Sequence, residues 1–158
     1  MTDFEAIIKV LDVQKVSYIV VGGMAAIIHG SSRLTLDFDI VYDRSKENLG
    51  KLVKALAPSN PYLRGIPPGL PFEWSVKTLE LGLNFTLTTS LGPIDLLGEI
   101  TAGGGYQELI PKSVEVELFG YRCKALDLPT LIKVKRAVAR PKDLDILSEL
   151  ESLLGEEE

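Results

Sequence analysis

The sequence predicts an α/β protein built on a mixed β-sheet flanked by helices. Helical and strand periodicities alternate between residues 3 and 57, and residues 83–98 contain the two apolar runs of a β-hairpin. Helical crossovers and antiparallel pairing therefore occur in one chain, which is typical of a mixed sheet. The chain has 158 residues, of which 46% are hydrophobic, enough for one ordinary domain with a real core. We expect a single domain over residues 1–158, with an α/β core over 1–124 and a helical segment over 125–158.

The first elements follow from local patterns. Residues 3–16 carry apolar side chains at helical spacing, and residues 17–21, SYIVV, form a short β-branched run typical of a buried strand. Gly22 and Gly23 end that strand. The next expected elements are a short helix over 24–30, a strand over 38–43 and a helix over 45–57 that Ser45 caps.

Proline and glycine residues mark the boundaries of the expected elements in the rest of the chain. Five prolines and two glycines between residues 58 and 71 predict a loop. A helix starts at Asp127, with Pro129 in its first turn, and Pro141 separates it from a last amphipathic helix. The remaining expected elements are a hairpin over 83–98, a loop over 101–109, two strands over 113–126 joined around Phe119-Gly120, and the two helices over 127–139 and 142–154.

Composition excludes several classes of protein. No apolar run reaches the ~20 residues of a membrane span, and the N-terminus lacks the basic start and apolar stretch of a secretory signal. The single cysteine, Cys123, rules out an internal disulfide framework and a cysteine-rich zinc site, so a reducing cytoplasm is the simplest setting. A net charge of −5 argues against strong general affinity for nucleic acid. It leaves room for a small anionic ligand held by a local basic cluster.

Two aspartates flank one phenylalanine at the start of the second expected strand. Side chains at i and i+2 of a strand share a face, so Asp37 and Asp39 are expected side by side. Two close carboxylates repel each other unless a cation lies between them, and Mg²⁺ prefers such oxygen ligands. The alternative is a solvated strand end with no metal.

A third aspartate lies in an apolar strand. Asp95 stands among Ile94, Leu96 and Leu97 on the second arm of the hairpin. Beside the other two carboxylates it would complete a metal site, and it could accept the proton of an attacking hydroxyl.

The adjacent glycines lie between a strand and a helix. Without Cβ atoms, Gly22 and Gly23 allow a ligand to approach the backbone closely, and the start of a helix offers free N–H groups to phosphate. A tight turn without a ligand is the alternative. The spacing to Gly30 does not match the G-x-G-x-x-G pattern of a dinucleotide-binding turn.

Together these pieces resemble one family. The stretch VGGMAAIIHGSSRLTLDFDI, with a strand, a glycine turn, a helix and acid-x-acid on the next strand, is similar to the signature of the DNA polymerase β-type nucleotidyltransferase superfamily. It especially resembles the small prokaryotic branch of abortive-infection and toxin–antitoxin proteins, as does LPTLIKVKRAVARPKDLDIL near the C-terminus. Residues 45–83 show no such resemblance. The implied fold is polymerase β-like with C-terminal helices.

The resemblance implies roles for particular residues. Asp37, Asp39 and Asp95 would be the catalytic carboxylates, holding two Mg²⁺ ions, with Mn²⁺ as a substitute, and Asp95 would be the general base. The implied nucleotide-binding residues are Gly22, Gly23, Ser31, Arg33, Lys135, Arg136, Arg140 and Lys142. A triphosphate carries about four negative charges, which lysine and arginine stabilise. For the basic residues near the C-terminus, the alternative is a solvated helix end.

The implied function is transfer of NMP from an NTP to a hydroxyl acceptor, with release of pyrophosphate. The acceptor could be tRNA, a protein or a small molecule, and a role in a toxin–antitoxin or abortive-infection system would add a protein partner. The alternatives are a non-catalytic module that binds nucleotide or a partner, and a purely structural subunit. We expect His29 to be structural or substrate-facing, and Trp74 either to border the nucleobase or to cover the sheet.

Overall fold

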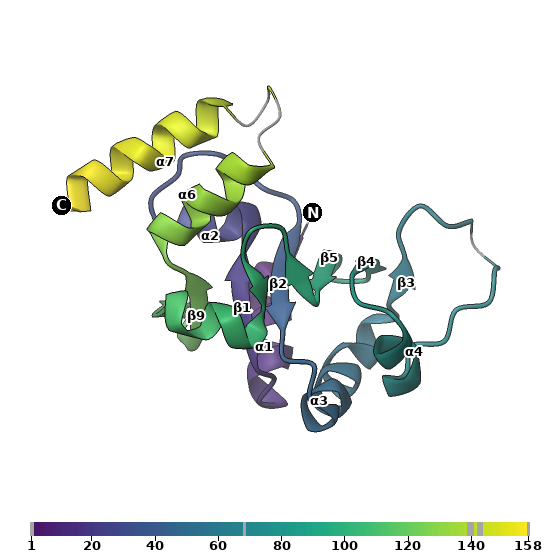
Figure 1. Ribbon diagram of the computed structural model, residues 1–158. Coiled ribbons are helices and arrows are strands. Elements are labelled where there is room, and N and C mark those ends of the chain that lie inside the picture. Colours follow the sequence, from purple (N-terminus) through teal and green to yellow (C-terminus); the bar gives the residue numbers. More distant parts are fainter. Residues whose placement is uncertain (1, 68, 139–140, 142–143, 158) are drawn as a thin grey trace.

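The computed structural model describes residues 2–67, 69–138, 141 and 144–157. Its centre is a seven-stranded mixed sheet with the order β3-β4-β5-β2-β1-β9-β8, and a separate two-stranded sheet pairs β6 with β7 (Figure 1). The strands are β1 Tyr18–Val21, β2 Phe38–Tyr42, β3 Tyr62–Leu63, β4 Phe85–Thr89, β5 Gly92–Leu97, β6 Glu99–Ile100, β7 Gly104–Gly105, β8 Ser113–Leu118 and β9 Tyr121–Leu126.

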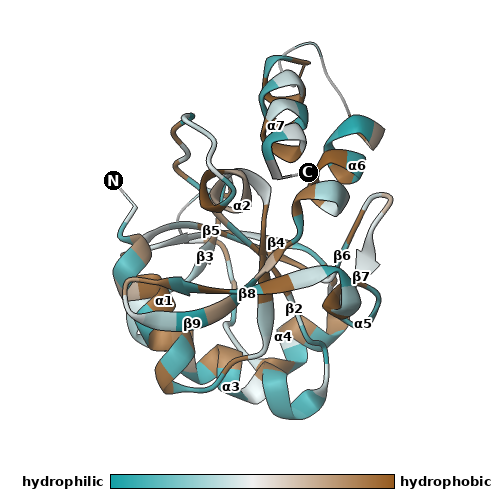
Figure 2. Ribbon diagram, turned by 90° about the vertical axis from the view of Figure 1, so that its left-hand side faces the viewer, coloured by the Kyte–Doolittle hydropathy of each residue, from teal (hydrophilic) through white to brown (hydrophobic). Residues whose placement is uncertain are grey.

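Helices cover both faces of the sheet. Figure 2 shows α2, α6 and α7 on one side, and α1, α3 and α4 on the other. The α-helices are α1 Phe4–Val13, α2 Gly22–Ile28, α3 Lys46–Leu56, α4 Val76–Leu81, α5 Tyr106–Leu109, α6 Leu128–Ala137 and α7 Leu144–Glu157, and short 3₁₀ turns cover Ala57–Ser59 and Ile110–Lys112. Within the described residues, no helix has the length and apolar character needed to cross a membrane.

Polar caps set where several helices begin. The side chains of Asp3, Ser45, Ser75 and Asp127 each accept a hydrogen bond from a backbone N–H in the first turn of α1, α3, α4 and α6. Such a bond satisfies a donor that has no partner within the helix. The expected caps at Ser45 and Asp127 are confirmed.

The core lies around the central strands. All four residues of β1 are buried, as are Phe38, Ile40 and Tyr42 of β2. The Phe38 ring makes edge contacts with Phe4 and Tyr18, at centroid distances of 6.1 and 6.4 Å. This packing leaves Asp39, between Phe38 and Ile40, on the other face of the sheet, the alternation expected for a strand.

Strand register brings distant residues together at β2. This strand runs antiparallel to β1, with Val21 opposite Asp39, and parallel to β5, with Asp39 opposite Asp95. The strand that ends in the glycine turn and the strand that carries Asp95 therefore flank Asp39 on its two sides.

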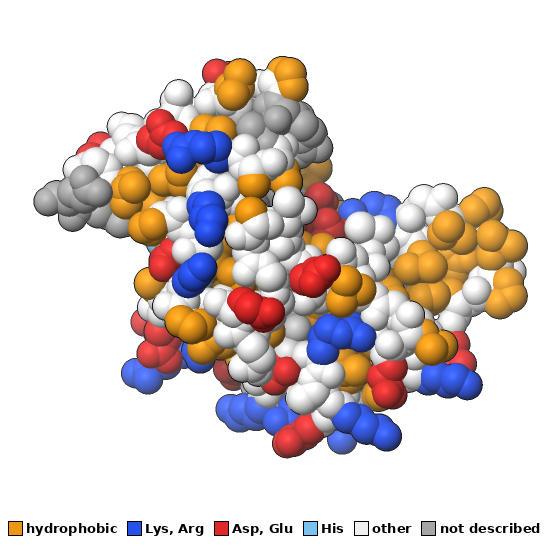
Figure 3. Space-filling model, viewed as in Figure 1, with side chains coloured by type: hydrophobic (Ala, Val, Ile, Leu, Met, Phe, Trp, Pro, Cys, Tyr) orange, Lys and Arg blue, Asp and Glu red, His pale blue; other side chains and the backbone are white. Residues whose placement is uncertain are grey.

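The fold prediction is confirmed, and its differences from the structure are local. Helix α2 begins at Gly22, so both glycines lie in its first turn and do not precede it. The expected loop over residues 58–71 contains the two-residue strand β3, and α4 follows it. The expected loop over 101–109 contains β7 and α5. Figure 3 shows apolar side chains gathered at the loop after β3, where Ile66 and Leu70 are exposed.

Candidate active site

Three carboxylates converge at one edge of the sheet. Asp37 immediately precedes β2, Asp39 lies in β2 and Asp95 lies in β5. One carboxylate oxygen from each lies within 4.8 Å of the others, and all three side chains are partly buried. The strand alternation of β2 and the parallel register of β2 with β5 together produce this cluster.

The carboxyl of Asp39 is partly buried and has a raised pKa. Its Oδ1 atom is buried and has no hydrogen-bond partner among the described residues. Burial, and then the carboxyls of Asp95 and Asp37, raise the pKa of Asp39 from 3.8 to about 7, while the charge of Lys135 acts in the opposite direction. Burial and the neighbouring carboxyls therefore favour the protonated form of Asp39, and a cation would favour its charged form.

The donor set fits a divalent cation. Carboxylate oxygens are the ligands that Mg²⁺ and Mn²⁺ take, and two of the three aspartates, Asp39 and Asp95, have a buried oxygen that accepts no hydrogen bond from the described residues. Asp37, Asp39 and Asp95 could each contribute one oxygen.

Arg64 contacts the third carboxylate. This residue follows β3, and its Nη2 atom lies 2.9 Å from Asp95 Oδ1 and donates to the Leu87 carbonyl at 2.7 Å. The side chains of Arg64 and Asp95 are 33% and 18% exposed, so the ion pair is shielded from most of the solvent. Sequence reasoning missed Arg64, because a two-residue strand inside a proline-rich stretch leaves no periodic pattern to detect.

Gly22 leaves the space that Asp39 occupies. Its φ of +67° lies in the left-handed region, and a Cβ atom there would overlap Asp39 Oδ2. At Gly23, a Cβ atom would lie 2.8 Å from Thr35 Oγ1. The turn at the start of α2 is thus packed directly against the acid cluster and the segment that leads into it.

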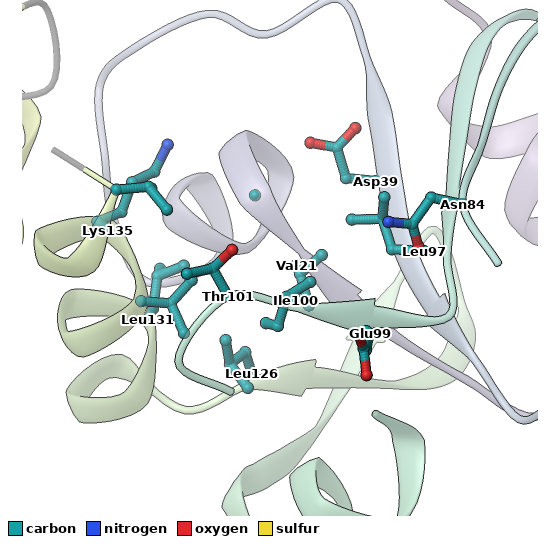
Figure 4. A pocket seen from close by; sticks show the side chains of 13 residues that line it. Val21, Asp39, Asn84, Leu97, Glu99, Ile100, Thr101, Leu126, Leu131 and Lys135 are labelled. Atoms are coloured by element: carbon teal, nitrogen blue, oxygen red, sulfur yellow. The ribbon is translucent and has the colours of Figure 1, made fainter. Parts of the chain in front are cut away.

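A cavity of about 290 Å³ opens beside the acids. Asp39 lies on one side of it, and Lys135 of α6 lies on the opposite side (Figure 4); Gly22 also lines it. Much of the lining is apolar, with Val21, Leu97, Ile100, Leu126, Leu131, Val134 and Val138, and Asn84, Glu99 and Thr101 add polar groups. The cavity combines a carboxylate edge, a lysine and an apolar wall, a set of surfaces that could accommodate a nucleotide.

Helix α7 engages two of the residues predicted to bind nucleotide. Ser31 Oγ donates to Glu149 of α7, which also accepts from the backbone and hydroxyl of Ser32, and Arg33 lies 3.9 Å from Asp145. The hydrogen bonds from Ser31 and Ser32 lower the pKa of the Glu149 carboxyl. The structure therefore gives Ser31 and Arg33 protein partners, away from the lining of the cavity.

The basic residues near the C-terminus divide into three groups. Lys135 lines the cavity. Arg136 forms an ion pair with Glu151 of α7 and does not line the cavity. Arg140 and Lys142 lie outside the described residues.

His29 and Trp74 have structural partners. His29 Nε2 is 2.8 Å from the Leu126 carbonyl, a contact that links α2 to β9. Trp74 Nε1 donates to the Val53 carbonyl of α3 at 2.9 Å, and its ring packs against the hydrophobic core. Of the two interpretations of Trp74, the structure supports covering the sheet. Sequence reasoning also missed Asn84, which lines the cavity and accepts from the Gly98 N–H at 2.8 Å.

Solved structures of similar fold include two nucleotidyltransferases. The lincosamide antibiotic adenylyltransferase LnuA, solved with lincomycin bound, superposes with a TM-score of 0.61 at 16% identity, over 96% of this chain and 98% of that one. A protein from Thermotoga maritima described as a nucleotidyltransferase gives a TM-score of 0.57 at 15% identity, over 94% and 89% of the two chains. No family model matches the sequence, and no curated protein matches it. The chain therefore has the fold of these nucleotidyltransferases over nearly its whole length.

Proposed function

We propose that this protein is a Mg²⁺-dependent nucleotidyltransferase that transfers NMP from an NTP to a hydroxyl acceptor and releases pyrophosphate. The convergence of Asp37, Asp39 and Asp95 beside the Gly22 turn is the observation that carries the proposal. The similarity of fold to LnuA over the whole chain supports it.

The proposed chemistry assigns a role to each part of the site. The acceptor oxygen forms a bond with the α-phosphorus while the bond between that phosphorus and the pyrophosphate oxygen breaks. Asp95 takes the proton of the attacking hydroxyl. Divalent cations held by Asp37, Asp39 and Asp95 would neutralise charge on the phosphates. We propose two such cations, as the resemblance to the DNA polymerase β-type nucleotidyltransferase superfamily implies.

Lys135 and the glycine turn would bind the phosphates. Lys135 lies opposite Asp39 across the cavity, so its ammonium group could stabilise charge on the leaving pyrophosphate. Gly22 and Gly23 place backbone N–H groups and no side chain at the start of α2, close to the acids. A nucleotide bound in the cavity would contact both.

The test is transfer of label from an NTP. Purified protein is incubated with each NTP, labelled with ³²P at either the α- or the γ-phosphate, with Mg²⁺ or Mn²⁺, and with a panel of acceptors: tRNA, a protein extract and small hydroxyl compounds. Lincosamides are included because LnuA is solved with lincomycin bound. We expect α-label, and no γ-label, to be transferred to one acceptor class.

Two variants make the test specific. Asp37→Ala combined with Asp39→Ala should abolish transfer, whereas Asp145→Ala, an exposed carboxylate on α7, should leave transfer unchanged. Nucleotide binding by calorimetry without transfer to any acceptor would favour the non-catalytic module. Absence of both binding and transfer would refute the proposal.

A role in a toxin–antitoxin or abortive-infection system is proposed from the resemblance of HGSSRLTLDFDI to that branch. Induced expression in a bacterial host should then arrest growth in an Asp39-dependent manner, or neutralise a co-expressed partner. Growth unaffected under both conditions would exclude this role.

A further inference from the structure

We infer that Arg64 competes with a divalent cation for Asp95 and thereby sets the affinity of the acid cluster for metal. This inference rests on the proposed metal-binding role of Asp37, Asp39 and Asp95. It adds a residue that neither the sequence motif nor the similarity of fold identifies.

Two anchors hold Arg64 over the sheet. Its backbone N–H donates to the Thr86 carbonyl at 2.9 Å, which places the residue beside strand β4. Its Nη2 atom donates to the Leu87 carbonyl at 2.7 Å. Strand β4 separates β3 from β5, so the side chain reaches across one strand to meet Asp95.

The ion pair occupies one oxygen of a proposed metal ligand. Arg64 Nη2 lies 2.9 Å from Asp95 Oδ1, and Asp95 is only 18% exposed. Asp37 and Asp39 have no ion-pair partner within 4.0 Å among the described residues. Of the three acids, Asp95 is thus the one whose charge a guanidinium already neutralises.

Competition and preorganisation predict opposite effects of Arg64 on the affinity of the acid cluster for the cation. If Arg64 competes with the cation, metal binding must disrupt or share the ion pair between Arg64 and Asp95, which weakens the affinity about tenfold. If Arg64 only fixed the Asp95 rotamer, it would strengthen binding by a few-fold at most. The shielded position of the pair, in which Arg64 Nη2 lies 2.9 Å from Asp95 Oδ1, favours competition.

The test measures Mn²⁺ binding without nucleotide, by the EPR signal of free Mn²⁺. Arg64→Gln should bind Mn²⁺ about tenfold more tightly than the wild type. Arg64→Lys, which lacks the guanidinium fork, should bind a few-fold more tightly, and it serves if the glutamine variant fails to fold. Arg122→Gln removes the same charge from an exposed position on β9 and should change the dissociation constant by less than about twofold.

The outcomes separate this inference from the proposed function. In an Asp95→Asn background, the effect of Arg64→Gln should shrink to less than about threefold, because the contested ligand is gone. If the wild type binds Mn²⁺ and Arg64→Gln binds it equally well or more weakly, the role of Arg64 is overturned and the metal site is retained. No Mn²⁺ binding by either protein would overturn both.

Discussion

Replacing Asp39 with asparagine should stabilise the metal-free protein while abolishing the proposed nucleotidyl transfer. Asp39 has a buried oxygen with no described partner, and its pKa is raised from 3.8 to about 7. Ionising a carboxyl with that shift costs the folded state on the order of 4 kcal/mol. Since Asp37 and Asp95 remain in the variant, we expect Asp39→Asn to raise the free energy of unfolding by about 2 kcal/mol at pH 8.

The raised pKa of Asp39 determines how the stability difference between the wild type and Asp39→Asn changes with pH. The unfolded chain ionises Asp39 above pH 3.8, whereas the folded protein ionises it only near pH 7. The wild type therefore loses stability relative to Asp39→Asn as the pH rises from about 4 to about 7, and the difference is constant above that range. Saturating Mg²⁺ should stabilise the wild type at pH 8 and leave the variant unchanged.

Urea denaturation at pH 5, 6, 7 and 8, with EDTA or Mg²⁺, measures these differences. Asp145→Asn is the matched control. Among the described residues this exposed carboxylate has one ion-pair contact, at 3.9 Å from Arg33, so its replacement should change stability by less than about 0.5 kcal/mol. A metal-free Asp39→Asn protein that is less stable than the wild type at pH 8 would show that the buried Asp39 carboxyl does not destabilise the fold. So would a difference that does not depend on pH.

Three further substitutions test other parts of the site. Gly22→Ala should destabilise the fold by about 1–2 kcal/mol in urea denaturation and reduce label transfer, because φ is +67° and the new methyl group would displace Asp39. If the variant transferred label at the wild-type rate, the turn and the acid would not be closely packed. Lys135→Gln should raise the KM for NTP at least tenfold with little change in Tm, and an unchanged KM would remove Lys135 from the phosphate site. Ser31→Ala should cost about 1 kcal/mol of stability through its bond to Glu149 and leave the KM unchanged, whereas a raised KM would show that Ser31 reaches the nucleotide.

Local patterns in the sequence were sufficient to predict most of the fold. Strands β1, β2, β4 and β5 have apolar runs bounded by turn residues, and α3 and α6 have caps that a short window reveals. The strand period also places Asp37 next to Asp39. Asp95 was predicted to join them through its place in the hairpin and through the family resemblance, and the parallel register of β2 with β5 brings it there.

The remaining features of the site depend on contacts between distant parts of the chain. Arg64 reaches Asp95 because Leu63 pairs with Leu87 on β4, and a two-residue strand carries no signal of that pairing. Ser31 and Glu149 are 118 residues apart, so the motif around Ser31 does not reveal that α7 engages it. A resemblance based on residue types cannot distinguish a serine that donates to a helix from one that donates to a phosphate.

We propose that Asp37, Asp39 and Asp95 form one metal-dependent centre for nucleotidyl transfer. A crystal of the protein grown with Mn²⁺ and a non-hydrolysable NTP analogue, measured at the manganese absorption edge, tests it directly. We predict anomalous density bounded by these three carboxylates, with the triphosphate lying between them and Lys135. Nucleotide or manganese bound elsewhere, with the acid cluster empty, would show that these three carboxylates do not form the metal centre.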